Sequence, residues 1–159
     1  MLGLVLSLGV VGATGAQTRE GVNVGGNSAF SKLVPAAQVE QAAAQQYAQM
    51  LAQARAQNAL AGANDPQLRR LRAIAAKITP FAADWNERAK GWKWEINLIG
   101  ANQINAFCMP GGKIAFYTGI LQTLKLSDDE VAMVMGHEMA HALREHARER
   151  MGKNAATGL

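Results

Sequence analysis

Two histidines and a glutamate in the segment GHEMAHALREH (136–146) have types and spacing that suit metal chemistry. On a helix, His137 and His141 lie about 40° apart around the axis and roughly 6 Å apart along it. Both imidazoles can then reach one zinc ion at Zn–N distances of about 2.0–2.1 Å. Glu138 lies about 100° further round, too far to be a natural third ligand but within reach of a metal-bound water. We interpret the segment as two zinc ligands and a general base.

The helix that must carry these residues has its own start signal. Ser127 and Glu130 form the Ser-x-x-Glu pattern of a capping box, and three acidic residues in the first turn suit the positive end of the helix dipole. Apart from Gly136, the segment then lacks glycine and proline until its end. The sequence therefore predicts one helix from Asp128 to about Met151.

A third histidine follows the pair but is out of phase with it. On a continuing helix, His146 lies about 140° round from His141. We therefore interpret His146 as structural or as a group outside the coordination sphere. Glu145 is better placed, but a third ligand from the same straight helix would strain tetrahedral geometry, so it is the weaker candidate. The metzincin pattern is excluded, because positions 144 and 147 hold Arg144 and Ala147 instead of glycine and histidine.

Upstream, the hydrophobic period changes from helical to alternating. In WKWEINLI, Trp92, Trp94, Ile96 and Leu98 share one face, which is typical of a half-buried strand. Two further strand-like runs, INAFCM and KIAFYT, are joined by PGG at 110–112, which predicts a hairpin. Helices around one small antiparallel sheet make the expected fold α+β and mainly helical.

Four segments are expected along the chain. Residues 1–16 are apolar and then small, like the core and cleavage site of a signal peptide, although no Lys or Arg precedes them. They predict export, to the periplasm or elsewhere in a bacterial envelope. Residues 17–35 are polar and Gly-rich and are typical of a linker. Residues 36–65 are expected to form an Ala/Gln-rich helix, and 66–159 the domain that carries the histidines.

Composition narrows the function further. The chain is 49% hydrophobic and 18% charged, which is a globular balance. Its net charge of +4 is compatible with weak attraction to a membrane surface. Basic and acidic residues alternate in LREHARERMGK, which favours a solvated helix face over a nucleic-acid site. A single cysteine, Cys108, excludes an intrachain disulfide, and we interpret it as a small packed side chain.

Two separate segments together resemble one known family. INAFCMPGGKIAFYTGIL and SDDEVAMVMGHEMAHALREHARER are similar to metallopeptidase family forty-eight, the HtpX-like, CAAX-prenyl-protease and Oma-type gluzincins. The shared features are Asn-Ala-Phe, a Gly-Gly turn, Thr-Gly, an acidic helix start, and Gly-His-Glu-x-x-His with a histidine five residues further on. The resemblance runs from about Leu68 to Arg150.

The resemblance implies a zincin-like fold and a zinc-dependent endopeptidase acting on proteins or peptides, with a role in envelope quality control. His137 and His141 would be the zinc ligands and Glu138 the general base. The strand residues Asn105, Ala106 and Phe107 would lie beside the cleft and bind substrate. An edge strand can accept a peptide as an added strand through backbone hydrogen bonds. The alternative is that Asn105 and Phe107 simply pack the sheet.

The resemblance also implies a third zinc ligand, a glutamate on a later helix. The last nine residues, MGKNAATGL, contain no carboxylate side chain. We therefore expect 66–159 to be the N-terminal part of a peptidase domain that is incomplete at its C-terminus and weakly active or inactive by itself. The alternative function is a non-catalytic, protease-like module that binds unfolded or outer-membrane proteins. The sequence predicts no oligomeric state.

Overall fold

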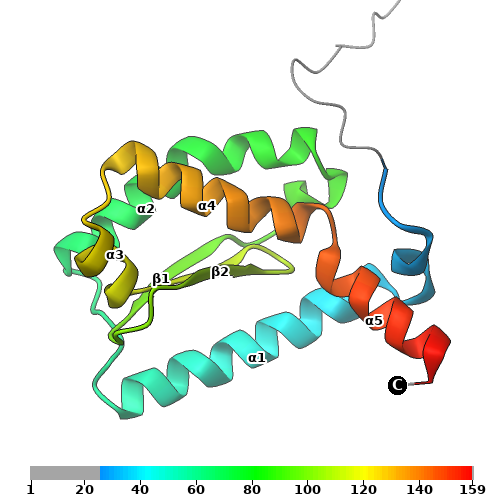
Figure 1. Cartoon of the computed structure of the whole chain (residues 1–159), viewed down its shortest axis with the longest axis horizontal. Coiled ribbons are helices and arrows are strands. Elements are labelled where there is room, and N and C mark those ends of the chain that lie inside the picture. The colour runs from blue at the N-terminus through cyan, green and yellow to red at the C-terminus, as the bar shows by residue number, and fades with distance from the viewer. Residues whose placement is uncertain (1–25, 159) are drawn as a thin grey trace, which may run out of the picture.

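The computed structural model describes residues 26–158, so the predicted signal peptide (1–16) lies outside the described residues. Figure 1 shows the order of the elements. Their bounds are η1 Ala29–Leu33, α1 Ala36–Ala56, α2 Pro66–Ile78, η2 Thr79–Asp84, η3 Glu87–Gly91, β1 Glu95–Ile99, β2 Ala106–Met109, β3 Lys113–Tyr117, α3 Thr118–Leu124, α4 Asp128–Leu143 and α5 His146–Thr157. None of the helices within 26–158 is long and apolar enough to cross a bilayer.

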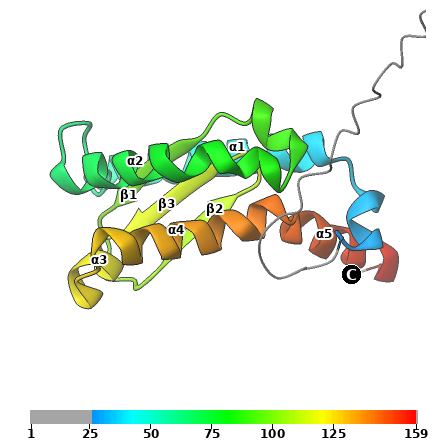
Figure 2. The same cartoon turned by 90° about the horizontal axis from the view of Figure 1, so that it is seen from above.

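The elements form three layers, with the small sheet as the middle layer. Helices α2 and α4 lie side by side on one face of the sheet, and α1 crosses the other face (Figures 1 and 2). Helix α4 packs chiefly over β2, and α2 over β1. Helix α5 and η1 pack against each other at one end of the molecule. The mainly helical α+β class is confirmed.

The three strands have the order β1-β3-β2, so the sheet is mixed and the predicted purely antiparallel sheet is wrong. The predicted hairpin of β2 and β3 is present, and Gly111 and Gly112 supply its turn with φ of 85° and 80°. β1, however, pairs with β3 in parallel, bringing Ile96 opposite Ile114 and Leu98 opposite Phe116. This pairing places all four side chains in the core under α2 and α4, a long-range requirement that local sequence does not show.

Alternation along the strands produces a core on each face. The first lies between the sheet and helices α2 and α4, and its least exposed large side chains are Leu68, Leu71, Leu98, Ile114, Phe116, Val131 and Met135. The second lies against α1 and centres on Tyr47, whose hydroxyl donates to the carbonyl of Ile114 and accepts from Asn97 Nδ2 at 3.0 Å. The predicted alternation of the first strand is confirmed by buried Ile96 and Leu98.

The two edges of the sheet differ. Helix α1 ends at Ala56, earlier than the predicted boundary at residue 65. The chain then runs beside β1, where Ala61 N donates to Leu98 O (3.0 Å) and Gly100 N donates to Ala59 O (2.6 Å). The outer edge of β1 is therefore partly covered. Among residues 26–158, β2 pairs with no strand other than β3, so its outer edge is open.

Part of the predicted linker has regular structure. Residues 29–33 form η1, which packs closely on α5. Arg148 of α5 donates to the carbonyl of Val34, and Asn27 Nδ2 donates to Glu145 Oε2 at 3.1 Å. A methyl group on Gly152 would lie 1.9 Å from Phe30 O, so only glycine permits this approach. The segment 27–34 thereby fastens α5 to the rest of the molecule.

Candidate metal centre

The start of α4 is fixed by the predicted capping box. Ser127 Oγ accepts from Glu130 N at 3.3 Å, and Ser127 N donates to Glu130 Oε2 at 2.7 Å. Arg70 of α2 then ties this end down, donating to Asp128 Oδ1 (2.6 Å) and Leu126 O (2.7 Å). The helix begins at Asp128 as predicted, which confirms the phase of the residues from Asp128 to Leu143.

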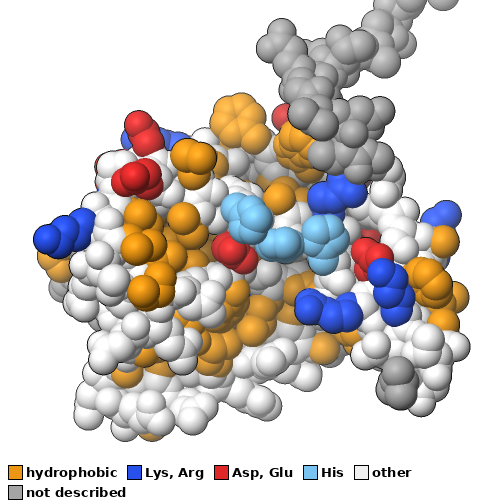
Figure 3. Space-filling model, viewed as in Figure 1, with side chains coloured by type: hydrophobic (Ala, Val, Ile, Leu, Met, Phe, Trp, Pro, Cys, Tyr) orange, Lys and Arg blue, Asp and Glu red, His pale blue; other side chains and the backbone are white. Residues whose placement is uncertain are grey.

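The apolar side of α4 settles which residues face outward. Its buried side chains are Val131, Met135, Met139, Ala142 and Leu143. His137 and His141 consequently lie on the exposed side, whereas Glu138 is partly buried, with 24% of its side chain exposed. Figure 3 shows the histidine side chains together on one open face of the molecule.

The two predicted zinc ligands converge. His137 Nε2 and His141 Nε2 are 3.1 Å apart, and the rings meet edge to face with centroids 4.7 Å apart. Because this separation is less than two Zn–N bonds of about 2.0–2.1 Å each, one zinc ion can contact both nitrogens. Two imidazoles that aim their Nε2 atoms at one point, on an exposed helix face, fit a zinc ion.

Glu138 shares a cavity with His141 and lies close to His137. Its Oε1 lies 4.0 Å from His137 Nε2. A cavity of about 530 Å³ is lined by Glu138, His141, Cys108 of β2 and residues of α5. Burial, and then the nearby Glu138 carboxylate, raise the pKa of Cys108 to about 12. Cys108 therefore stays a thiol, in agreement with its interpretation as a small packed side chain.

The predicted continuous helix to Met151 is wrong, because α4 ends at Leu143. Glu145 has φ of 57°, a left-handed conformation that is costly for a residue other than glycine. Its carboxylate accepts from Arg148 Nη1 (2.9 and 3.1 Å) and from Asn27, contacts that stabilise the turn. A new helix, α5, then starts at His146.

This turn brings His146 back to the metal centre. Its Nδ1 lies 2.8 Å from His141 Nδ1, so the expectation that His146 is out of phase with His141 is wrong. The contact is on the ring nitrogen opposite to the one that faces His137. If His141 Nε2 binds a metal, its Nδ1 carries the proton and donates it to His146 Nδ1. The interpretation of His146 as a group outside the coordination sphere agrees with this geometry.

His146 favours the neutral form that can accept a hydrogen bond from His141. Burial, followed by electrostatic interactions with His141 and Arg144, lowers the pKa of His146 and favours its neutral ring. Glu145, the weaker third-ligand candidate, is bound to Arg148 and Asn27 instead. In the part of the chain that the structure describes, no group of three His, Cys, Asp or Glu side chains is arranged to hold a metal.

The three predicted substrate-binding residues lie at the open edge of the sheet. Ala106 is buried in the core, the Phe107 ring packs beside Tyr117 at 6.3 Å between centroids, and Asn105 O accepts from Tyr117 N. Because hydrogen-bonded pairs alternate in an antiparallel ladder, the backbone groups of Ala106 and Cys108 face away from β3. Phe107 packs on the sheet and also lines the cavity, so both predicted roles are compatible with its position.

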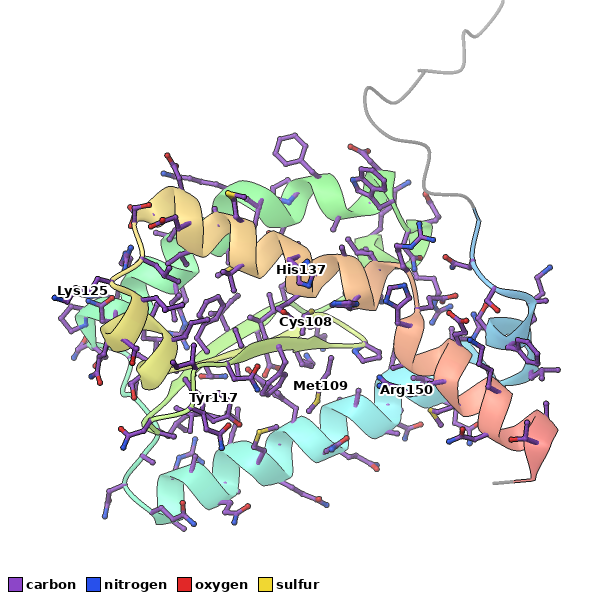
Figure 4. All side chains as sticks on the ribbon, in the orientation of Figure 1. Cys108, Met109, Tyr117, Lys125, His137 and Arg150 are labelled. Atoms are coloured by element: carbon purple, nitrogen blue, oxygen red, sulfur yellow. The ribbon has the colours of Figure 1, made fainter. Side chains whose placement is uncertain are left out.

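Sequence reasoning missed the wall that α5 contributes. His146, Glu149, Arg150 and Lys153 line the cavity together with Glu138 and His141. Figure 4 shows Arg150 on α5 and Cys108 below α4, with His137 on α4 above the strands. The only hint in the sequence was the basic pattern after residue 143, which is uninformative while one straight helix is assumed.

The chain matches known peptidases over its second half. The profile of peptidase family M48 matches residues 67–157. The chain is 46% identical over 65 residues to the mitochondrial metalloendopeptidase OMA1 of Arabidopsis thaliana, covering 41% of this chain and 13% of that protein. It is 36% identical over 59 residues to OMA1 of Homo sapiens, covering 37% and 11%. It is 31% identical over 77 residues to the metalloprotease LoiP of Escherichia coli, covering 48% and 30%.

These relatives contradict one prediction and limit another. The OMA1 proteins of plants, yeasts and animals are mitochondrial by name, and LoiP shares a lower identity, so the predicted location in a bacterial envelope is wrong. The aligned regions cover less than a third of each relative reported above, so the chain spans only part of their length.

The family follows from the match and the geometry together. The matched residues 67–157 are more than half of the chain, and they include β2, α4 and the converging histidines. Two predicted motifs, the Asn-Ala-Phe strand and the His-Glu-x-x-His helix, lie side by side in the structure. The chain belongs to peptidase family M48 and carries part of its peptidase domain.

Proposed function

We propose that the protein carrying this chain is a zinc-dependent endopeptidase that hydrolyses peptide bonds with a metal-activated water. One observation carries the proposal: His137 Nε2 and His141 Nε2 converge to 3.1 Å on the helix that places Glu138 in the adjoining cavity. Membership of a metallopeptidase family and the names of the OMA1 and LoiP relatives support it.

Each residue has a distinct role in this proposal. His137 and His141 would hold the zinc, which would act as a Lewis acid and lower the pKa of bound water. Glu138 would take the proton from the attacking water and later pass it to the leaving amine. His146 holds the His141 ring in the orientation that points Nε2 outward.

The substrate is proposed to be a protein or peptide segment in extended conformation. The open edge of β2 presents the backbone groups of Ala106 and Cys108 next to the cavity that contains Glu138. An extended segment can add to such an edge as a further strand. Of the predicted residues Asn105, Ala106 and Phe107, only Ala106 would then bind substrate through its backbone, together with Cys108, while Asn105 and Phe107 flank it with their backbone groups directed to β3. Recognition through the backbone favours breadth over strict sequence preference.

Glu138→Gln tests the proposal in the complete protein. The variant keeps the shape of the side chain but cannot take a proton, so kcat/KM on a quenched fluorescent peptide should fall by about 10²–10⁴. Its thermal unfolding and zinc content should match the parent protein. Asp129→Asn, an exposed change in the first turn of the same helix, is the matched control. Unchanged cleavage by Glu138→Gln would contradict the proposal.

Measurements of binding and cleavage with and without zinc distinguish the proposed endopeptidase from the non-catalytic alternative. A protease-like binding module would retain unfolded chains equally well with and without a chelator, and the parent protein would cleave nothing in the presence of zinc. The endopeptidase instead loses cleavage when zinc is removed and regains it when zinc is restored.

A further inference from the structure

One face of α5 forms a wall of the cavity beside the metal centre. Three residues of α5 lie three, four and seven positions after His146 and therefore share one face of the helix with it: Glu149, Arg150 and Lys153. All four line the cavity that also contains Glu138 and His141. The turn at Glu145 directs this face toward the cavity, whereas a continuous helix would have left it solvated.

The charges on this wall do not cancel. Lys153 Nζ lies 2.6 Å from Glu149 Oε1, and these two residues neutralise each other. Arg148, which lies off this face, is committed to Glu145 and to the carbonyl of Val34. Arg150 is exposed, and its guanidinium makes no hydrogen bond or ion pair within residues 26–158. One uncompensated positive charge therefore remains on the wall.

The position of Arg150 relative to the metal centre follows from the contacts. His146 touches His141 at 2.8 Å, and Arg150 lies one turn, about 6 Å, further along α5. Cys108 and Pro110 form the facing wall, at the end of β2. Figure 4 shows Arg150 on the side of α5 toward the tip of the β2–β3 hairpin. A peptide that adds to β2 and continues past Cys108 would run beside Arg150.

An extended peptide advances about 3.3 Å per residue, so a side chain about two or three residues from the scissile bond would reach this guanidinium. A guanidinium presents a planar fork of donors that matches both oxygens of a carboxylate. We propose that Arg150 makes this cavity select substrates that carry an Asp or Glu side chain about two or three residues from the scissile bond. This side chain belongs to the part of the substrate that runs beside α5. This inference rests on the proposed peptidase function.

Peptide binding tests the selectivity without any need for catalysis. Short, otherwise neutral peptides, each with a single Glu or Gln at successive positions, are titrated against the metal-free protein by fluorescence anisotropy. At one position the Glu peptide should bind about fivefold tighter than its Gln partner, the size expected for one partly exposed ion pair. Arg150→Gln should abolish this difference, and Arg150→Glu should replace it with a preference for Lys.

Arg69→Glu is the matched control, because Arg69 is also exposed but lies on α2, away from the cavity. This variant makes the same change in net charge and should keep the preference for Glu. The preference should also shrink with rising salt, since partly exposed charges are screened over about 8–10 Å at physiological ionic strength. A preference that depends only on shape would not respond to salt.

The ratio of kcat/KM for the Glu and Gln peptides gives a second readout in the zinc-loaded protein. A preference in binding without cleavage would support the role of Arg150 while contradicting the proposed peptidase function. An equal Glu-to-Gln ratio in the parent protein and in Arg150→Gln overturns the inference. Failure of any peptide to bind overturns it as well.

Discussion

His146 Nδ1 lies 2.8 Å from His141 Nδ1, on the side of the ring opposite to the nitrogen that faces His137. This contact connects α5 directly to the metal centre on α4. The orientation of His141, a predicted zinc ligand, consequently depends on the position of α5. Helix α5 packs against η1, which lies near the start of the described residues.

Replacing His146 should weaken zinc binding without abolishing it. His146→Ala removes the acceptor for the His141 Nδ1 proton, and loss of such an outer partner typically costs about 10–100-fold in metal affinity. Competition with a chromophoric chelator measures the affinity. His146→Gln, which keeps an acceptor, should fall between the alanine variant and the parent protein. An unchanged affinity in His146→Ala would contradict the assigned role.

Gly152→Ala should release η1 from α5. The added methyl group would meet Phe30 O at 1.9 Å, a backbone atom that cannot move without the segment around it. Hydrogen exchange of residues 28–34 should become markedly faster, even where the rest of the fold keeps its protection. Gly136→Ala is the matched control, because this helical glycine has no atom within 4 Å of the added carbon. Equal hydrogen exchange of residues 28–34 in both variants would contradict the role of Gly152 in attaching η1 to α5.

Acid should weaken the attachment of α1 to η3. Hydrogen bonds from Arg88 (2.8 Å to each oxygen), opposed by burial and helped by Trp92, lower the pKa of Glu40 below 4.5. A carboxyl group with a lowered pKa stabilises the fold above its unfolded pKa, and this contribution is lost as pH falls through the folded value.

The contribution of Glu40 should be about 0.5–1 kcal/mol, because both partners are partly exposed (21% and 43%). Urea unfolding near neutral pH and near pH 3 should show Glu40→Gln to be destabilising only at the higher pH. Glu87→Gln breaks a more exposed pair with Lys90 and should have a smaller effect. An equal loss of unfolding free energy at both pH values in Glu40→Gln would show that the ionised carboxylate of Glu40 is not the source of this stability.

Cys108 should react slowly with thiol reagents while the protein is folded. With its pKa raised from 9.0 to about 12, mainly by burial, the thiolate fraction near pH 8 falls about a thousandfold. The raised value also means that stability from the neutral thiol is present below pH 9 and is lost as pH rises toward 12. Labelling rates with and without urea measure the protection. Glu138→Gln, which removes the smaller cause, should increase the folded rate only modestly.

The features that sequence predicted correctly are those with local signals. The capping box set the start of α4 at Asp128, PGG marked the hairpin, and alternation located the first strand. Each depends on residues within one turn or one strand, where propensity and capping act. The phase of His137, Glu138 and His141 followed from the helix start alone.

The features that were missed depend on distant contacts. Glu145 carries no glycine-like signal for a helix break, and its conformation is stabilised by Arg148 and by Asn27, which is 118 residues away. The parallel pairing of β1 with β3 likewise reflects shared burial under α2 and α4. The contact of His146 with His141 and the orientation of Arg150 both follow from that break.

Zinc bound per chain, measured by elemental analysis after dialysis against fixed free zinc, tests the central claim most directly. The parent protein and Glu138→Gln should bind the same amount, because Glu138 is not a ligand. His137→Ala and His141→Ala should each lose at least about tenfold in affinity, since each removes one of two converging nitrogens. Undiminished zinc binding in either histidine variant, or its loss in Glu138→Gln, would contradict the assignment of ligands and base.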